Sequence, residues 1–225
     1  MIASRTPKPD MIEFSPRYLR AKRILDVIFT LLMLPLLGVV IAIIALLIWL
    51  DSDGPVFFRQ KRVGQNGVVF EMLKFRSMYI NTDDSTHRQA IEQYMNGKSL
   101  NGAAENDMMF KLCDDPRVTR VGRVIRKMSL DELPQFFNVL QGTMTLVGPR
   151  PPLLYEVELY SARHMLRLCG KPGLTGPWQV YGRSRVPFGD MVEMDIAYLQ
   201  QQSIWLDLKL IFLTIPVMML GRGGA

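Results

Sequence analysis

The sequence predicts a helix-dominated α+β protein that is held on one face of a membrane. Three observations lead to this fold class: residues 27–50 carry no charge, the segment around Asn66 and Gly67 alternates apolar and polar residues, and residues 204–220 are apolar apart from two charges. The 225 residues, 48% of them hydrophobic, suffice for one folded unit and exclude an intrinsically disordered chain.

Composition narrows the classes of partner and of site. Lysine and arginine number 27 against 21 acidic residues, which gives a net charge of +6. This balance suits phosphates, nucleic acid or an anionic membrane surface, and composition does not choose among them. Cys113 and Cys169 lie far apart without a nearby Cys or His, which argues against a zinc cluster, a CxxC redox pair or a disulfide framework.

The charge-free run predicts a membrane helix. It would be roughly 36 Å long as a helix, which is enough to cross a bilayer and too long for the apolar part of a signal peptide. Basic residues flank it on both sides, so both ends resemble a cytoplasmic side. Pro35 lies inside the run and kinks a helix there. We therefore predict a basic segment over residues 1–23 and a re-entrant helix hairpin over residues 24–50, bent at Leu34-Pro35. A plain transmembrane helix with a proline kink stays the alternative.

Charged residues at the two apolar segments need their own explanation. Asp26 lies at the entry edge of the membrane helix, and Lys22 or Arg23 is close enough in sequence to be its partner. Residues 204–220 predict an amphipathic helix in the membrane interface, with Trp205 at headgroup level. A buried core helix is an equally open interpretation of that segment.

The remaining chain, residues 51–225, is expected to form a domain facing the cytosol. Asn66-Gly67 between alternating runs predicts a β-hairpin within residues 55–78. Residues 81–115 are polar and irregular and predict an excursion from the domain, not a second domain. Helices are predicted near residues 88–95, 117–126, 135–140 and 153–168, with a stop at Gly142 and a site-forming loop over residues 172–185.

Asp131 and Glu132 are the strongest candidates for chemistry. They stand just ahead of Pro134, and because proline is tolerated only in the first turn of a helix, both carboxylates are expected at a helix N-terminus. One interpretation is structural, since Ser129 to Glu132 fits the S-x-x-E capping box. The other is catalytic, because adjacent carboxylates exceed what a cap requires and basic residues lie on both sides. An ionised Asp beside a bound phosphate can attack phosphorus when a divalent cation screens the like charges.

Three motifs carry a family resemblance. They read SLDELPQFFNVLQGTMTLVGPRPPL (129–153), LKFRSM before it and KPGLTGPWQVYGR after it. Together they closely resemble the bacterial sugar transferases, which are monotopic polyprenyl-phosphate phosphoglycosyl transferases. The resemblance covers nearly the whole chain and indicates the short, catalytic-core form. It also implies a re-entrant first helix, in agreement with the flanking charges.

The resemblance implies a reaction and roles for individual residues. A phospho-sugar would pass from a UDP-sugar to polyprenyl (undecaprenyl) phosphate, giving polyprenyl diphosphate sugar and UMP. Asp131 would be the nucleophile that forms a covalent aspartyl phospho-sugar intermediate, and Glu132 would help it to hold Mg²⁺. Positive positions that serve the phosphates or the substrate are matched by Lys74, Arg126, Arg150 and Arg183.

The resemblance also implies a place in the cell and a set of partners. The protein would lie on the cytoplasmic face of the bacterial inner membrane, with residues 51–225 as its catalytic domain, and would catalyse the first membrane step of polysaccharide or glycoconjugate biosynthesis. Its partners would be the UDP-sugar, undecaprenyl phosphate and membrane lipid, with a homo-oligomer left open. The sequence does not indicate the sugar or the pathway. The polar segment 81–113 is longer than in the most compact members of the family, and Pro152 is a second proline after the usual motif.

Two other functions fit parts of the sequence. Asp51-Ser52-Asp53 is a DxD pattern, which would suit a direct, metal-dependent glycosyltransferase that releases UDP, although a capped turn explains it more simply. A non-catalytic membrane adaptor is the second alternative. Its basic residues lack the interleaved aromatics of a single-strand binder, so we expect no nucleic acid partner. His87 and His164 have no partner at ligand spacing and are expected to be exposed or capping.

Overall fold

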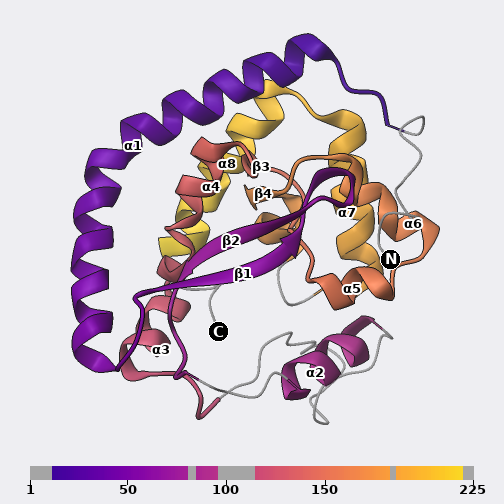
Figure 1. The fold of residues 1–225 in the computed structure, drawn as a ribbon. Coiled ribbons are helices and arrows are strands. Elements are labelled where there is room, and N and C mark those ends of the chain that lie inside the picture. The colour runs from indigo at the N-terminus through magenta and orange to yellow at the C-terminus, as the bar shows by residue number, and fades with distance from the viewer. Residues whose placement is uncertain (1–11, 81–84, 96–114, 183–185, 220–225) are drawn as a thin grey trace.

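The computed structural model describes residues 12–80, 85–95, 115–182 and 186–219. A long helix, α1, wraps around one side of a body that contains two two-stranded sheets and several short helices (Figure 1). The described elements are α1 (Pro16–Asp51), β1 (Phe57–Val63), η3 (Gln65–Gly67), β2 (Val69–Phe75), α2 (Ser85–Met95), α3 (Arg120–Lys127), η5 (Leu130–Glu132), α4 (Gln135–Gln141), β3 (Thr145–Val147), α5 (Leu154–Glu158), α6 (Ala162–Met165), η6 (Leu166–Cys169), β4 (Gly173–Thr175), η7 (Trp178–Gly182), α7 (Phe188–Gln201) and α8 (Ile204–Met219).

Helix α1 carries the predicted membrane segment. It runs over 36 residues with Pro35 inside it, and Figure 1 shows it as two arms that differ in direction, with the other elements on the inner side of the bend. Among the described residues it is the one helix long and apolar enough to cross a membrane. It is not a core helix, because Leu32 and Leu36 are 70% and 65% exposed. A long apolar helix is thus confirmed, whereas its re-entrant path stays a prediction.

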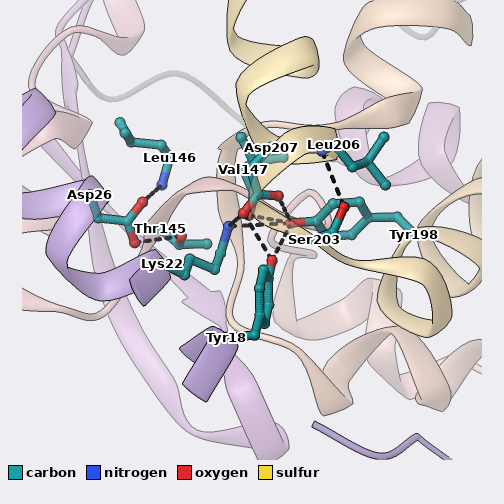
Figure 2. Close-up of polar contacts among 10 residues, drawn as sticks. All are labelled: Tyr18, Lys22, Asp26, Thr145, Leu146, Val147, Tyr198, Ser203, Leu206 and Asp207. Atoms are coloured by element: carbon teal, nitrogen blue, oxygen red, sulfur yellow. Dashed lines mark hydrogen bonds and ion pairs between the residues drawn. The ribbon is translucent and has the colours of Figure 1, made fainter. Parts of the chain in front are cut away.

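Polar contacts attach the first arm of α1 to the body (Figure 2). Lys22 Nζ donates to Asp207 Oδ2 of α8 at 2.7 Å. The predicted pairing of Asp26 with Lys22 or Arg23 is wrong, since no ion pair joins these side chains. Asp26 instead accepts hydrogen bonds from the Thr145 hydroxyl at 2.6 Å and the Leu146 N–H at 3.0 Å. These two donors satisfy the buried carboxylate, and the positive charge of Lys22 acts on it without direct contact.

The predicted β-hairpin is confirmed. Strands β1 and β2 pair antiparallel, from Phe57 opposite Phe75 to Val63 opposite Val69. The turn lies at η3, where Asn66 has a φ of 55° and Gly67 a φ of 80°. Asn and Gly tolerate this left-handed backbone better than other residues, which is why the Asn-Gly pair marks the turn.

A second, parallel sheet was not predicted. Its strands β3 and β4 pair Thr145 with Gly173 and Val147 with Thr175. The main hydrophobic core lies around this sheet, the hairpin and α7. Fully or nearly fully buried members include Val63, Met72, Val139, Met144, Val147, Val192, Ile196 and Leu210.

The predicted short helices are largely confirmed. Helices α2, α3 and α4 lie close to the predicted ranges, and Gly142 ends α4 with a φ of 83°. The single helix predicted over residues 153–168 is wrong. The chain there forms α5, α6 and η6, because Ser161 starts a new helix by accepting a hydrogen bond from the His164 N–H. The loop predicted over residues 172–185 contains β4 and the short turn η7, and residues 183–185 lie outside the described ranges.

Helix α8 has one buried and one exposed face. Asp207 and Leu210 are fully buried, whereas Trp205 and Phe212 are 82% and 67% exposed. The exposed side is itself mostly apolar, so the helix has no separate polar face and the predicted amphipathic character is not confirmed. Its buried face contacts the body, as the core-helix interpretation requires, and its exposed face is available to an apolar surrounding.

Candidate active site

Asp131 and Glu132 lie in a short 3₁₀ turn, η5, between α3 and α4. Ser129, just before the turn, has a φ of 56° and forms no side-chain cap, so the capping-box interpretation is wrong. Helix α4 begins only at Gln135, with Pro134 at its N-cap position. The carboxylates thus precede the helix by one turn, and both side chains are partly exposed. A strained residue beside exposed acids is a common feature of functional turns.

Lys74 lies beside this turn and forms an ion pair with Glu132. Its Nζ lies 3.2 Å from Glu132 Oε1, and its side chain is 20% exposed against 42% for Glu132. Lys74 lies near the end of β2, so the strand and η5 form one small charged surface. Such a partly exposed pair contributes little to stability, at most about 1 kcal/mol. Its interest is that it places a cation beside two carboxylates.

Asn138 holds α4 against the hairpin. Its Oδ1 accepts from the Leu73 N–H at 2.9 Å, and its Nδ2 donates to the Glu71 carbonyl at 2.8 Å. The side chain is 1% exposed. With these two bonds the Asn138 side chain pairs with the backbone of β2 in the way that a neighbouring strand would. Asn138 therefore fixes the distance between the strand of Lys74 and the helix that follows the acidic turn. Sequence reasoning missed it.

A second group of charges surrounds Arg150. Its guanidinium lies 3.4 Å from Glu156 and 5.8 Å from the centre of the Trp178 ring. Its carbonyl accepts from Arg167, which forms a fully buried ion pair with Asp195 of α7. Arg167 thus holds the backbone of the loop that carries Arg150.

Arg62 lies between the two charged groups and was not predicted as a site residue. It is buried, and one guanidinium nitrogen donates to the Pro151 carbonyl at 2.9 Å. Burial, followed by the positive charge of Arg150, lowers the pKa of Arg62 to about 10, while Glu156 and Glu132 act in the opposite direction. The guanidinium stays protonated at neutral pH. Arg62 therefore interacts electrostatically both with Glu132 of the acidic turn and with the Arg150–Glu156 pair.

Comparison with known proteins identifies the family. The bacterial sugar transferase family matches residues 17–221. The chain belongs to this family. It is 43% identical over 92% of its length to the galactosyl transferase CpsE of Streptococcus agalactiae, and 40% identical over 91% to the exopolysaccharide production protein ExoY of Sinorhizobium fredii. It is 39% identical over 86% to the UDP-glucose:undecaprenyl-phosphate glucose-1-phosphate transferase of Escherichia coli.

The relatives differ in length. The chain spans 88% of ExoY, but only 44% of CpsE and 39% of the E. coli transferase. Two of these bacterial sugar transferases therefore contain more than the region shared with this chain.

The structure says less about the two remaining predicted site residues, Arg126 and Arg183. Arg126 lies in the last turn of α3, five residues before Asp131, and its side chain is partly buried. Its guanidinium forms no hydrogen bond or ion pair with another described residue. Arg183 lies outside the described ranges. Their roles, like those of Asp131, Glu132, Lys74 and Arg150, stay predictions.

Asp51 of the DxD pattern and His164 both have structural roles. Asp51 Oδ2 accepts from the Val121 N–H at 3.0 Å, in the first turn of α3, so this aspartate has a structural role at a distant helix and not in the local capped turn that was predicted. His164 takes part in the cap of α6 through the Ser161 N–H, which donates to Nδ1 at 3.3 Å. The His87 side chain lies outside what the structure describes.

The acidic turn fits a magnesium ion better than a transition metal. Within the described ranges no three His, Cys, Asp or Glu side chains gather as a metal cluster. Asp131 and Glu132 offer only carboxylate oxygens, from adjacent positions. Mg²⁺ is bound in many phosphate-transferring sites by one or two carboxylates together with substrate phosphates. The donor set of the turn therefore suits Mg²⁺ whose other ligands are phosphate oxygens and water.

Proposed function

We propose that this chain transfers a phospho-sugar from a UDP-sugar to undecaprenyl phosphate, giving undecaprenyl diphosphate sugar and UMP. The main support is the partly exposed acidic turn beside Lys74, in a chain of the bacterial sugar transferase family. Two relatives point the same way by name, one a galactosyl transferase and one a glucose-1-phosphate transferase that acts on undecaprenyl phosphate.

Asp131 is the proposed nucleophile. A carboxylate oxygen of Asp131 attacks the β-phosphorus of the UDP-sugar, the bond to the bridging oxygen breaks, and UMP leaves with that oxygen. The product is an aspartyl phospho-sugar. A phosphate oxygen of undecaprenyl phosphate then attacks the same phosphorus, and the bond to Asp131 breaks. The carboxylate is regenerated, so atoms and charge balance over the two steps.

Glu132 and Lys74 orient the turn. Their contact at 3.2 Å fixes the Glu132 carboxylate next to Asp131 and places a cation where phosphate oxygens would gather. With Asp131, Glu132 would hold Mg²⁺, which neutralises phosphate charge during phosphoryl transfer. Lys74 then has two states, paired with Glu132 when the site is empty and free to meet a phosphate when the carboxylate is engaged.

The arginines form the rest of the proposed substrate site. Arg126 and Arg150 would bind the diphosphate and the phosphate of the lipid, and Arg183 is the least supported member. Arg62, buried and held by Pro151, supports the position of Arg150 without needing contact with substrate. Cations arranged in advance around a phosphate supply much of the rate in phosphoryl transfer.

The proposed location follows from the two substrates. One is soluble and the other is embedded in lipid, so the nucleophile must lie at headgroup level. A re-entrant α1, bent at Pro35, with the exposed face of α8 in the interface, would hold the acidic turn there. We propose the cytoplasmic face of the bacterial inner membrane, where UDP-sugars are made.

A labelled donor tests the chemistry. The full chain is incubated with a UDP-sugar carrying ³²P in the β-position, without lipid acceptor, and both the nucleotide product and the protein are analysed. We expect UMP and label on the wild-type chain, and neither from Asp131→Asn. Asp190→Asn, an exposed aspartate in the first turn of α7, is the matched control and should behave as wild type.

The same incubation, repeated with undecaprenyl phosphate present as acceptor, separates the alternatives. Release of UDP with no label on the protein would instead support a direct glycosyltransferase. Membrane binding without any turnover in the presence of undecaprenyl phosphate would support an adaptor. Wild-type turnover in Asp131→Asn would remove Asp131 as the nucleophile.

A further inference from the structure

A cavity with several charged and polar side chains in its wall, called the polar cavity below, lies at the opposite end of α4 from the acidic turn. It has a volume of about 150 Å³ and is enclosed by the first arm of α1, the start of β3, the segment before β4 and the end of α7. Its walls include Lys22, Arg23, Asp26, Lys171 and Gln202. Arg23 marks its place, because it donates to the Val139 and Leu140 carbonyls at the C-terminal end of α4. Asp131 and Glu132 precede the N-terminal end of that helix, about 10 Å away along its axis.

Most charges in the wall are already bonded. Lys22 is paired with Asp207 at 2.7 Å and also donates to the Tyr198 hydroxyl (Figure 2). Burial, followed by the negative charge of Asp207, raises the pKa of Tyr198, so its hydroxyl stays protonated. Two hydrogen bonds satisfy Asp26 on the body side, and two carbonyls satisfy Arg23. These groups build the wall and hold their positions without a ligand.

Two donors in the wall remain unsatisfied. Lys171 is half-buried and forms no hydrogen bond or ion pair with another residue that the structure describes. The Nε2 of Gln202 is buried and has no hydrogen-bond partner. Buried donors are normally bonded, and an orphaned one costs about 1–3 kcal/mol. A cation and an amide donor at one polar cavity therefore indicate that an acceptor belongs there.

The charge of the wall selects the class of acceptor. Burial, followed by the positive charges of Arg23 and Lys22, lowers the pKa of Lys171 despite the nearby Asp26. The charges of Lys22 and Arg23 are balanced by Asp207 and Asp26, so Lys171 is the cation of the wall that has no carboxylate of its own among the described residues, and an anion would supply one. At about 30 Å³ per water molecule the cavity holds a few waters, or one small oxyanion with fewer. A phosphate group combines the charge, the acceptors and the size.

In the proposed membrane arrangement, the cavity also lies where lipid phosphates are concentrated. Along α1 the exposed apolar surface begins beside it, with Ile24 and Ile28 at 59% and 53% exposed. On a helix that enters lipid, this border between charged and apolar residues coincides with the headgroups. We propose that the cavity binds a phosphate group through Lys171 and Gln202, separately from the acidic turn, so that a bound phosphate joins α1, α7 and the β3–β4 sheet.

Thermal unfolding with two phosphate sources tests the site. The full chain in a maltoside detergent is titrated with inorganic phosphate against chloride at constant ionic strength, and separately with phosphatidylglycerol against diacylglycerol, which lacks the phosphate. The apparent affinity is read from the rise in the unfolding midpoint. We expect Lys171→Gln to weaken it about tenfold, the loss of one charge-assisted bond, and Gln202→Leu to weaken it less.

Lys61→Gln is the matched control, because Lys61 is an exposed lysine on β1. It should leave the affinity unchanged, and phosphate binding elsewhere on the chain cancels in the comparison. Loss of the phosphatidylglycerol effect in Lys171→Gln assigns the site to a lipid headgroup, and loss of the inorganic phosphate effect alone assigns it to free phosphate. Equal responses of Lys171→Gln and Lys61→Gln to both sources would overturn the proposal.

Discussion

Glu132 forms the ion pair that joins the acidic turn to the hairpin. Its contact with Lys74 joins β2 to the acidic turn at 3.2 Å, and the sequence separates these residues by more than fifty positions. No local pattern could have placed them together. The pairing makes Glu132 a residue with two alternative partners, the lysine and a divalent cation, and this alternative can be tested.

Glu132→Gln is expected to weaken the dependence on magnesium. The substitution keeps the shape of the side chain but removes the charge that would bind the ion, so the Mg²⁺ concentration for half-maximal UMP release should rise about tenfold or more. Glu193→Gln, which removes an exposed acid paired with Arg163, serves as control. An unchanged magnesium curve in Glu132→Gln would mean that the ion, if required, is held elsewhere.

Single residues also show where sequence reasoning stops. Asp131 and Glu132 were predicted because adjacent carboxylates ahead of Pro134 exceed what a cap requires and basic residues flank them, but they lie in a separate 3₁₀ turn before α4 and not at its N-terminus. The capping box was wrong because Ser129 adopts a left-handed backbone, which the S-x-x-E pattern does not encode. Arg62 was missed because its importance comes from burial beside Pro151, and one arginine within a strand gives no signal.

Among the secondary-structure elements, those with local signals were predicted well. The hairpin follows from Asn66-Gly67, and the end of α4 from Gly142. Strands β3 and β4 were missed because three-residue strands are too short to show a period, and parallel pairing joins distant segments. The break before α6 did leave a signal, since Ser161 is a good N-cap residue inside the predicted helix.

Asn138 holds α4 against β2, and Asn138→Ala should therefore destabilise the fold. The substitution leaves the Leu73 N–H and the Glu71 carbonyl without their partner, at about 1–3 kcal/mol for each group that stays buried. We expect a lower midpoint of thermal unfolding and reduced UMP release, because β2 also carries Lys74. Gln141→Ala, exposed on the same helix, is the control. A wild-type midpoint in Asn138→Ala would show that water replaces the amide.

For the molecule as a whole, the distribution of exposed apolar residues is the main clue to its setting. Large apolar side chains are exposed along α1 and on the outer face of α8, whereas the polar cavity lies between the first arm of α1 and the body. The sequence predicted both helices from hydropathy, but hydropathy alone does not separate a spanning helix from a re-entrant one. The flanking charges and Pro35 favour the re-entrant path, and labelling from one side of the membrane can decide.

The re-entrant path predicts that both ends of α1 are labelled from the same side. In a chain whose Cys113 and Cys169 are replaced by alanine, single cysteines are placed by Ser15→Cys before α1 and Lys61→Cys on β1, both exposed positions. A membrane-impermeant maleimide added to inside-out vesicles should label both, and in right-side-out vesicles neither. Leu36→Cys, near the proline, should be protected in both, because lipid covers it in either topology. Labelling of the first two cysteines from opposite sides would establish a spanning helix and would place the acidic turn and the N-terminal segment on different faces.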